Sequence, residues 1–345
     1  MARSKNLVPL YGKILDALAR INRWASYADI AREIFLNFFS IFLIRKKRNK
    51  MERKVHQIPL FKDSLNNKIV NVASVKQLSL FRYPGGKTWL VPVIREWLQN
   101  REKRPIELIE VFAGGGIIGL TVAHEQLADH VTMIELDPEV AAVWHTILSK
   151  DAEWLAQRIL DFDLSLSNTY QALEKPASDT KERAFQTVLK NRTFYGGILA
   201  PGSTFLKHGA NGKGIASRWY PKTLAKRIRY ITTFRERITF IEGDGLQYMR
   251  ATAERPEVAY FIDPPYTAPG KRAGRRLYKF FKIDHEALFD IASSVRGDFM
   301  MTYDNADSVR AMAESHGFHV STVPMKGTHH NEILELLITP GEHVL

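Results

Sequence analysis

The residues best suited to chemistry are Asp263, Pro264, Pro265 and Tyr266, which directly follow the apolar run 260–262. Neither proline can donate a hydrogen bond to a β-ladder, so a strand predicted for the apolar run must end there. The exocyclic amine of a nucleobase is a weak nucleophile because its lone pair is delocalised into the ring. A carboxylate and a backbone carbonyl that accept hydrogen bonds from this amine would make its nitrogen more nucleophilic. An aromatic ring could then stack on the base. A strand end that is merely capped by Asp263 at a surface turn would show the same residues.

A second group of residues suits an adenosine-containing cofactor. The apolar run 106–112 predicts a strand, Gly114 and Gly116 follow Phe112 in a glycine-rich turn, and 117–123 predicts a helix. Strand, glycine turn and helix is a nucleotide-binding arrangement, and Glu135 ends the next predicted strand, where an acid can bind ribose hydroxyls. Because the glycine spacing lacks the pyrophosphate fingerprint, the cofactor that fits best is S-adenosylmethionine. A structural glycine turn in another α/β fold is the alternative.

Two further segments could complete such a site. Tyr83 precedes a Pro-Gly-Gly turn that contains Gly86, and Lys87 then opens a predicted helix, so this lysine could hold a carboxylate or a phosphate. A simple surface turn explains these residues as well. Asp244 follows another predicted strand, 238–242, and could accept a hydrogen bond from an adenine amino group.

Basic and aromatic residues are interleaved with glycine between 190 and 229, a composition that can hold phosphates and read bases from loops. A second basic stretch follows Tyr266 and is suited to a nucleic-acid backbone. The candidate DNA-contacting residues are Asn191, Arg192, Tyr195, Lys207, Arg218, Lys271, Arg272, Arg275 and Arg276. A long exposed loop without function is the alternative for the first stretch, but glycine- and aromatic-rich loops of this length are more often functional.

The overall composition agrees with a polyanionic partner. The chain has 345 residues, and 49 Lys and Arg against 37 Asp and Glu give a net charge of +12. It has no cysteine, which excludes disulfides, thiolate metal sites and the cysteine nucleophile that methylation of a pyrimidine ring carbon requires. The most apolar stretch, 34–44, is too short to span a bilayer, so we expect no membrane association and a cytoplasmic location.

The order of these segments predicts the domain organisation. Residues 1–45 show helical periodicity and 46–78 form a basic linker. Residues 79–340 alternate strands and helices, and 150–235 form a helical and target-recognition insertion. We therefore expect an α/β fold in which a mostly parallel sheet is flanked by helices.

Taken together, the motifs resemble the Dam-like D12 class of DNA adenine-N6 methyltransferases, in the order that places target recognition between the cofactor and catalytic motifs. The resemblance rests on Arg82–Lys87, Phe112–Gly116, Glu135, Asp244 and Asp263–Tyr266. It implies an S-adenosylmethionine-dependent methyltransferase fold. Lys87, Gly114, Gly116, Glu135 and Asp244 would bind the cofactor, and Asp263 and Tyr266 would bind a flipped adenine. Gly245 departs from the pattern because many relatives have an aromatic residue there.

The resemblance predicts methyl transfer to adenine N6 in double-stranded DNA, by direct in-line attack and without a metal. A companion restriction nuclease would be consistent with it. Two alternatives stay open at this point. The same turn could bind the amine of cytosine and give N4-methylcytosine, although motif order and the aspartate favour adenine. The chain could also be a DNA-binding regulator with an inactive methyltransferase domain.

Overall fold

The computed structural model describes residues 72–82, 85–209, 212–265, 277, 279–280, 282–326 and 332–341. The chain forms two compact units, Met1–Val55 and His56–Leu345. The predicted helical extension 1–45 and the first part of the predicted linker, up to residue 71, lie outside the described residues. All of the described residues therefore belong to the second unit.

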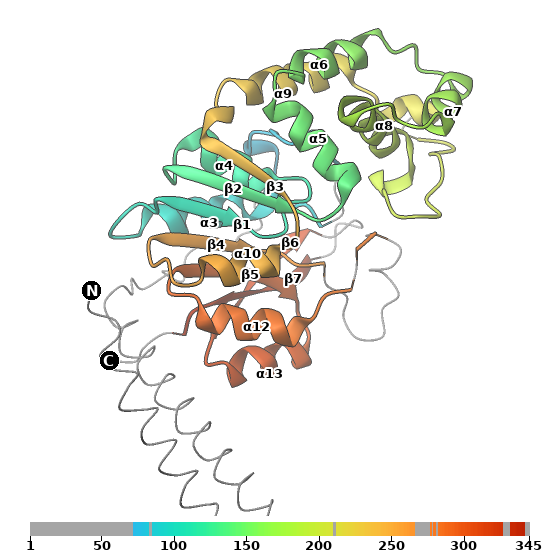
Figure 1. The fold of residues 1–345 in the computed structure, drawn as a ribbon. Helices are drawn as coiled ribbons and strands as arrows, with labels where there is room; N and C mark the ends of the chain where they lie inside the picture. The colour runs from blue at the N-terminus through green and yellow to red at the C-terminus, as the bar shows by residue number, and fades with distance from the viewer. Residues whose placement is uncertain are drawn as a thin grey trace, which may run out of the picture. The chain divides into compact units, whose positions relative to one another are not determined.

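A seven-stranded sheet with the strand order β3-β2-β1-β4-β5-β7-β6 forms the centre of this unit (Figure 1). The strands are β1 Glu107–Glu110, β2 His130–Glu135, β3 Ile238–Glu242, β4 Val258–Ile262, β5 Asp298–Asp304, β6 His319–Lys326 and β7 Glu332–Thr339. β1 to β5 run parallel, and β7 is antiparallel to both β5 and β6. The predicted α/β fold with a mostly parallel sheet is therefore confirmed. β1 lies between β2 and β4, which is the switch point where open α/β sheets bind ligands.

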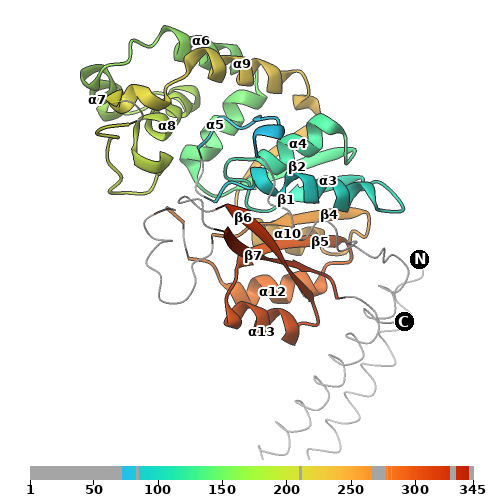
Figure 2. The same cartoon turned by 180° about the vertical axis from the view of Figure 1, so that it is seen from behind.

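Helices cover both faces of the sheet because alternate side chains of each buried strand point to opposite faces (Figures 1 and 2). In β1, Leu108 packs with α3 Val91–Gln99, α4 Ile117–Glu125 and α5 Pro138–Leu148. Its neighbour Ile109 packs in a second cluster with α10 Gly245–Thr252, α12 His285–Ser294 and α13 Asp307–Ser315. The strands thus bury both faces, as expected for a parallel sheet.

Aspartates that follow strands or loops fix the starts of several helices. Asp137 accepts a hydrogen bond from the backbone N–H of Glu139 at α5, and Asp244 caps α10 in the same way through Leu246. Asp284 caps α12 through the backbone N–H of Ala287. An N-cap carboxylate satisfies a backbone donor that has no partner within the helix, and its charge is favourable at that end. These caps place acidic groups at the carboxyl edge of the sheet.

Four helices lie between α5 and β3 in the sequence: α6 Ala152–Asp161, α7 Leu166–Glu174, α8 Thr180–Thr193 and α9 Pro221–Thr232. α6, α8 and α9 pack beside α5, and α7 packs on α8. Phe162, after α6, contacts the rings of Phe185 at 5.2 Å and Trp219 at 6.0 Å between centroids. The segment between α8 and α9 has short 3-10 turns, Tyr195–Gly197 and Gly214–Arg218. The basic, glycine-rich loop predicted from the sequence is thus anchored at both ends by buried helices.

The strand β6 was not predicted from the sequence. Its alternation of Val320 and Val323 with polar residues is weak, and Pro324 argues against a central strand. The structure resolves the conflict because β6 is an edge strand whose partner among the described strands is β7, and an edge position tolerates a proline. None of the helices in the described part of the chain is long and apolar enough to cross a membrane.

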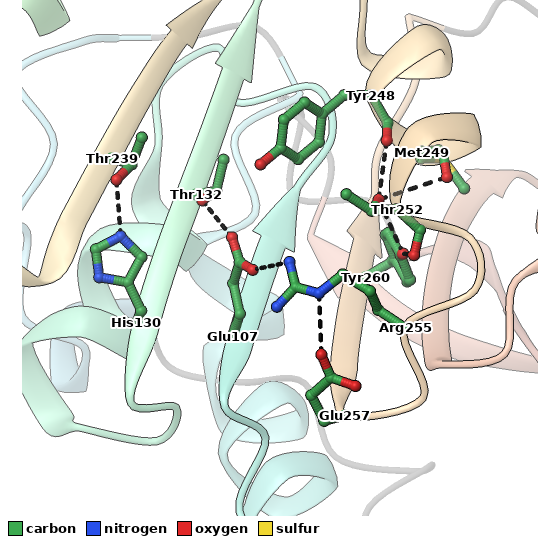
Figure 3. Close-up of polar contacts among 10 residues, drawn as sticks. All are labelled: Glu107, His130, Thr132, Thr239, Tyr248, Met249, Thr252, Arg255, Glu257 and Tyr260. Carbon is green, nitrogen blue, oxygen red and sulfur yellow. Dashed lines mark hydrogen bonds and ion pairs between the residues drawn. The ribbon is translucent and has the colours of Figure 1, made fainter. Parts of the chain in front are cut away.

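A polar network fixes the amino ends of the strands, away from the predicted site (Figure 3). Glu107, at the start of β1, is buried and accepts hydrogen bonds from the Thr132 hydroxyl of β2 and from Arg255 Nη1 at 2.5 Å. Arg255 also donates to Glu257 Oε1 at 2.9 Å. The guanidinium therefore joins the start of β1 to the connection between α10 and β4.

Replacement of Arg255 by Met should lower the free energy of unfolding by about 2 kcal/mol, because Glu107 would keep its burial but lose its cation. Urea denaturation measures this change. Arg250→Met, at an exposed position on α10, is the control and should stay within about 0.5 kcal/mol of the parent protein. Equal stability of the two variants would show that the ion pair does not hold this end of the sheet.

Candidate active site

A cavity of about 700 Å³ opens at the carboxyl ends of β1, β2 and β4. It brings together predicted residues that are far apart in the sequence. The predicted residues that line it are Gly86, Lys87, Phe112, Gly114, Gly116, Glu135, Asp244, Asp263 and Pro265. Pro264 adjoins it in the chain, whereas Tyr83 and Tyr266 lie outside the described residues. The strand ends thus gather the predicted cofactor and catalytic motifs at one site.

The glycine turn after β1 makes room for a ligand because its backbone needs glycine. Gly114 and Gly116 have φ angles of 46° and 63°, in the left-handed region that side chains disfavour. A Cβ atom on Gly116 would also lie 2.8 Å from Trp144 Cζ2. Trp144 Nε1 donates to the Gly114 carbonyl at 3.0 Å. The turn is therefore held close to α5 while it lines the cavity.

Glu135 is oriented by the same turn. Its Oε2 accepts a hydrogen bond from Gly114 N and its Oε1 from Asp137 N, both at 2.8 Å. Burial raises the pKa of this carboxyl to about 7, although the two backbone donors oppose the shift. Each carboxylate oxygen has a further lone pair, so Glu135 can accept from two neighbouring hydroxyl groups.

Glu110 is a functional candidate that our sequence reasoning missed. It is a buried acid at the end of β1, it lines the cavity, and its Oε2 accepts from Gly119 N at 2.8 Å. Burial, reinforced by the nearby carboxylates of Asp263 and Glu135 and opposed by the Gly119 hydrogen bond, raises its pKa to about 8. An acid at the end of a predicted buried strand, directly before the glycine turn, was the available signal. A cation in the cavity would lower these raised pKa values and favour the ionised forms of Glu110 and Glu135 beside Asp263.

Asp263 ends β4 and is held through one oxygen. Its Oδ1 accepts a hydrogen bond from the Thr302 hydroxyl at 2.8 Å and contacts Lys87 Nζ at 2.9 Å. Burial by itself would lower the pKa of Lys87, but the carboxylates of Asp263 and Glu335 outweigh it and raise that pKa. Within the described part of the chain, Asp263 Oδ2 makes no hydrogen bond. The carboxylate therefore has a fixed orientation and an open acceptor atom.

The structure explains why Gly245 departs from the family pattern. A Cβ atom there would overlap the Val111 carbonyl oxygen, because the start of α10 packs directly against the end of β1. No aromatic side chain fits at this position. Phe280 and Leu136 are exposed apolar side chains that line the cavity, so other elements supply its apolar surface.

The predicted DNA-contacting residues are placed unequally. Asn191 is fully buried, and its side chain bonds the backbone of Arg82 at 2.9 Å and of Gly197 at 2.7 Å. Arg192 is buried too and donates to the Leu80 carbonyl. This placement does not fit the prediction that Asn191 and Arg192 contact DNA directly, because both side chains hold the loop from inside. An isolated sequence cannot show that burial.

Other predicted positions face solvent. Tyr195 is 67% exposed and adjoins Gly196, which lines the cavity. Lys207 is exposed, and Arg218 is partly exposed. The predicted basic residues Lys271, Arg272, Arg275 and Arg276 lie outside the described residues.

Four arginines gather where the loop meets the cavity: Arg82, Arg192, Arg218 and Arg227. Burial, together with the positive charges of the other three arginines, lowers the pKa of Arg192 to about 9. Two buried atoms, Arg192 Nε and Arg218 Nη1, have no hydrogen-bond partner among the described residues. Among the described residues, no carboxylate contributes to the pKa shifts of Arg82, Arg192 or Arg227. An anion would be stabilised here.

Comparisons with known proteins were made on sequence and on structure. A model of the D12 class N6 adenine-specific DNA methyltransferase family matches residues 83–326, more than half of the chain. A search of curated proteins gives no match.

Similar solved structures include three methyltransferases. A putative RNA methyltransferase from Pyrococcus horikoshii is 11% identical, with 86% of this chain and 97% of that chain covered and a TM-score of 0.33. A precorrin-6y C5,15-methyltransferase from Geobacter metallireducens is 10% identical, with 82% and 98% covered and a TM-score of 0.31. The rRNA methyltransferase aviRa from Streptomyces viridochromogenes is 14% identical, with 83% and 94% covered and a TM-score of 0.34. At these values none of the three bears on substrate or site.

The raised pKa of Glu110 predicts a pH dependence of stability. Between its ordinary value of 4.5 and about 8, this carboxyl binds a proton in the folded but not in the unfolded chain. The contribution of Glu110 to the free energy of unfolding should therefore be fully present below pH 4.5 and should be lost as pH rises toward 8. Glu110→Gln should remove much of that fall in urea denaturation at about pH 5 to 8.5.

Glu153→Gln, at an exposed position on α6, should leave the fall in place. If Glu110→Gln showed the same pH dependence as the parent protein, the burial of a proton on Glu110 would be contradicted. Glu135 acts in the same direction up to about pH 7, so some dependence should persist in the variant.

Proposed function

This chain belongs to the D12 class N6 adenine-specific DNA methyltransferase family, and from that premise we propose that it transfers the methyl group of S-adenosylmethionine to adenine N6 in double-stranded DNA. The observation that carries the proposal is Asp263, whose carboxylate is fixed through Oδ1 and open at Oδ2 on the edge of the cavity. An oriented acceptor of this kind suits the amine of a base.

The cavity residues fit S-adenosylmethionine. When bound, this cofactor supplies a methyl group on a sulfonium, a good leaving group that needs no metal. Glu135 would accept from the ribose hydroxyls, and Asp244 would accept from the adenine amino group. The glycine turn allows close backbone approach. A sulfonium beside Glu110 and Glu135 would favour their ionised forms, whereas a phosphate there would disfavour them, which supports a cationic cofactor over a phosphorylated one.

Asp263 and the Pro264 carbonyl would bind the adenine amine as two acceptors. The amine has two N–H groups, and a hydrogen bond to each acceptor leaves the nitrogen lone pair free to attack in line. Lys87 and Thr302 hold the carboxylate during this step, so its acceptor atom does not reorient. Positioning and a preorganised acceptor supply the rate increase. The base must leave the duplex to reach the cavity, and Tyr266 would stack on it.

The arginine cluster supports DNA as the substrate. Arg82 also lines the cavity, so an anion held by Arg82 and Arg218 would lie beside the target nucleotide. Their uncompensated charge suits the phosphodiester backbone, which dominates affinity for DNA. Tyr195 and Lys207 would add contacts from the same loop.

Asp263→Ala should lower methyl transfer to DNA by about 10³-fold, because the amine loses its charged acceptor. S-adenosylmethionine binding, measured by equilibrium dialysis, should change less than about threefold, since one lost contact of this kind is weak. Asp290→Ala, at an exposed carboxylate on α12, is the control and should be fully active. Retained turnover in Asp263→Ala would exclude the proposed role.

Arg218→Gln should weaken DNA binding about tenfold at low salt and reduce the slope of log affinity against log salt by about 1, the change expected for one lost phosphate contact. Arg104→Gln serves as the control. Arg104 is exposed and precedes β1, so it lies at the amino ends of the strands, away from the cavity at their carboxyl ends. A fluorescence anisotropy titration at several salt concentrations gives both quantities. An unchanged slope for Arg218→Gln would argue against a phosphate at the arginine cluster.

A further inference from the structure

Glu335 has an unusual position in β7. Its neighbours Ile333 and Leu334 are 46% and 41% exposed, whereas Glu335 is only 6% exposed. The usual pattern, in which apolar side chains are buried and charges face water, is thus reversed at these residues. A buried carboxylate is costly unless a cation or several donors compensate it. Its retention at this position requires a partner.

Lys87 is that partner, and it is shared. Lys87 is 3% exposed, and its Nζ lies 3.7 Å from Glu335 Oε2, 2.9 Å from Asp263 Oδ1 and 2.9 Å from the Gly85 carbonyl oxygen. The contacts to Asp263 and to the Gly85 carbonyl are at hydrogen-bond distance, whereas the contact to Glu335 is a longer ion pair. One cation thus lies between two carboxylates, and its charge is divided between them.

This division decides which part of Asp263 stays available. An ammonium paired with a single carboxylate is attracted by both of its oxygens. Here Lys87 Nζ is paired with Oδ1 of Asp263, and the Thr302 hydroxyl binds that same oxygen. Asp263 and Glu335 together carry two negative charges and Lys87 only one positive charge. The charge of Asp263 is therefore only partly neutralised.

We infer that Glu335 is a positioning residue for methyl transfer: it holds Lys87 against Oδ1 of Asp263 and so keeps Oδ2 open and negative for the substrate amine. The inference rests on the proposed function. Glu335 acts through Lys87 and does not itself contact the substrate.

The test replaces Glu335 by Gln, which keeps the shape and removes the charge. Single-turnover methyl transfer at saturating S-adenosylmethionine and DNA should slow by about 10- to 100-fold, as expected when a reacting group loses its alignment. The dissociation constant for S-adenosylmethionine should change less than about twofold, because the change acts on the catalytic acceptor. A parallel loss of binding and rate, or no loss of rate, would overturn the inference.

A double-mutant cycle with Lys87→Met separates positioning from a merely structural role. If Glu335 acts through Lys87, then Glu335→Gln should slow the Lys87→Met protein no further. If the double variant instead showed the product of the two single rate losses, the inference would be overturned. This comparison also holds if Glu335→Gln alone folds poorly, because the double variant removes the cation together with the carboxylate.

Glu107→Gln is the matched control. Glu107 is similarly buried and paired with a cation, but it lies at the opposite ends of the strands. The Glu107→Gln protein should be less stable than the parent protein but should keep its single-turnover rate. Wild-type transfer in the same assay separates the two possible failures: no transfer to DNA would defeat the proposed function, whereas normal transfer by Glu335→Gln would defeat this inference alone.

Discussion

The burial of one ammonium between two carboxylates is the interaction on which the site depends. Lys87 comes from the turn before α3, Asp263 from the end of β4 and Glu335 from β7, so this contact joins three distant parts of the chain. Each charge would be costly alone in the interior, and together they compensate one another. Because β7 is inserted antiparallel between β5 and β6, its early residues lie beside the carboxyl end of β5. The topology thereby brings a second acid to the edge where the catalytic turn ends.

Acidic and basic side chains lie in different parts of the proposed site. Acidic groups line the cavity at the strand ends, and arginines gather beside it in the loop between α8 and α9. A cationic cofactor and an anionic DNA backbone would each meet the opposite sign, and neither would be attracted to the site of the other. The buried residues Asn191 and Arg192 contribute to this arrangement indirectly, because they fix the loop that presents Tyr195 and Arg218. Asn191 and Arg192 thus hold the loop in place, although the basic and glycine-rich composition of their segment predicted contact with DNA.

Several strands along the chain and the motifs at their ends were predicted because local rules determine both. Proline ends β4 and glycine permits the turn after β1 wherever the rest of the chain lies. What could not be predicted depends on contacts between distant segments. The pairing of Lys87 with Glu335, the hydroxyl of Thr302 on Asp263 and the burial of Arg192 arise only when the sheet is assembled. The edge strand β6 was missed because its pattern is weak and its partner β7 comes later in the chain.

The central claim is that the open carboxylate of Asp263 serves the amine of adenine. The most direct measurement is transfer of tritium from labelled S-adenosylmethionine to unmethylated duplex DNA, followed by digestion to nucleosides and chromatography. The account predicts that the label appears in N6-methyladenine. Label in N4-methylcytosine would contradict the substrate, and a protein that binds S-adenosylmethionine and DNA without any transfer would contradict the catalytic role of the site.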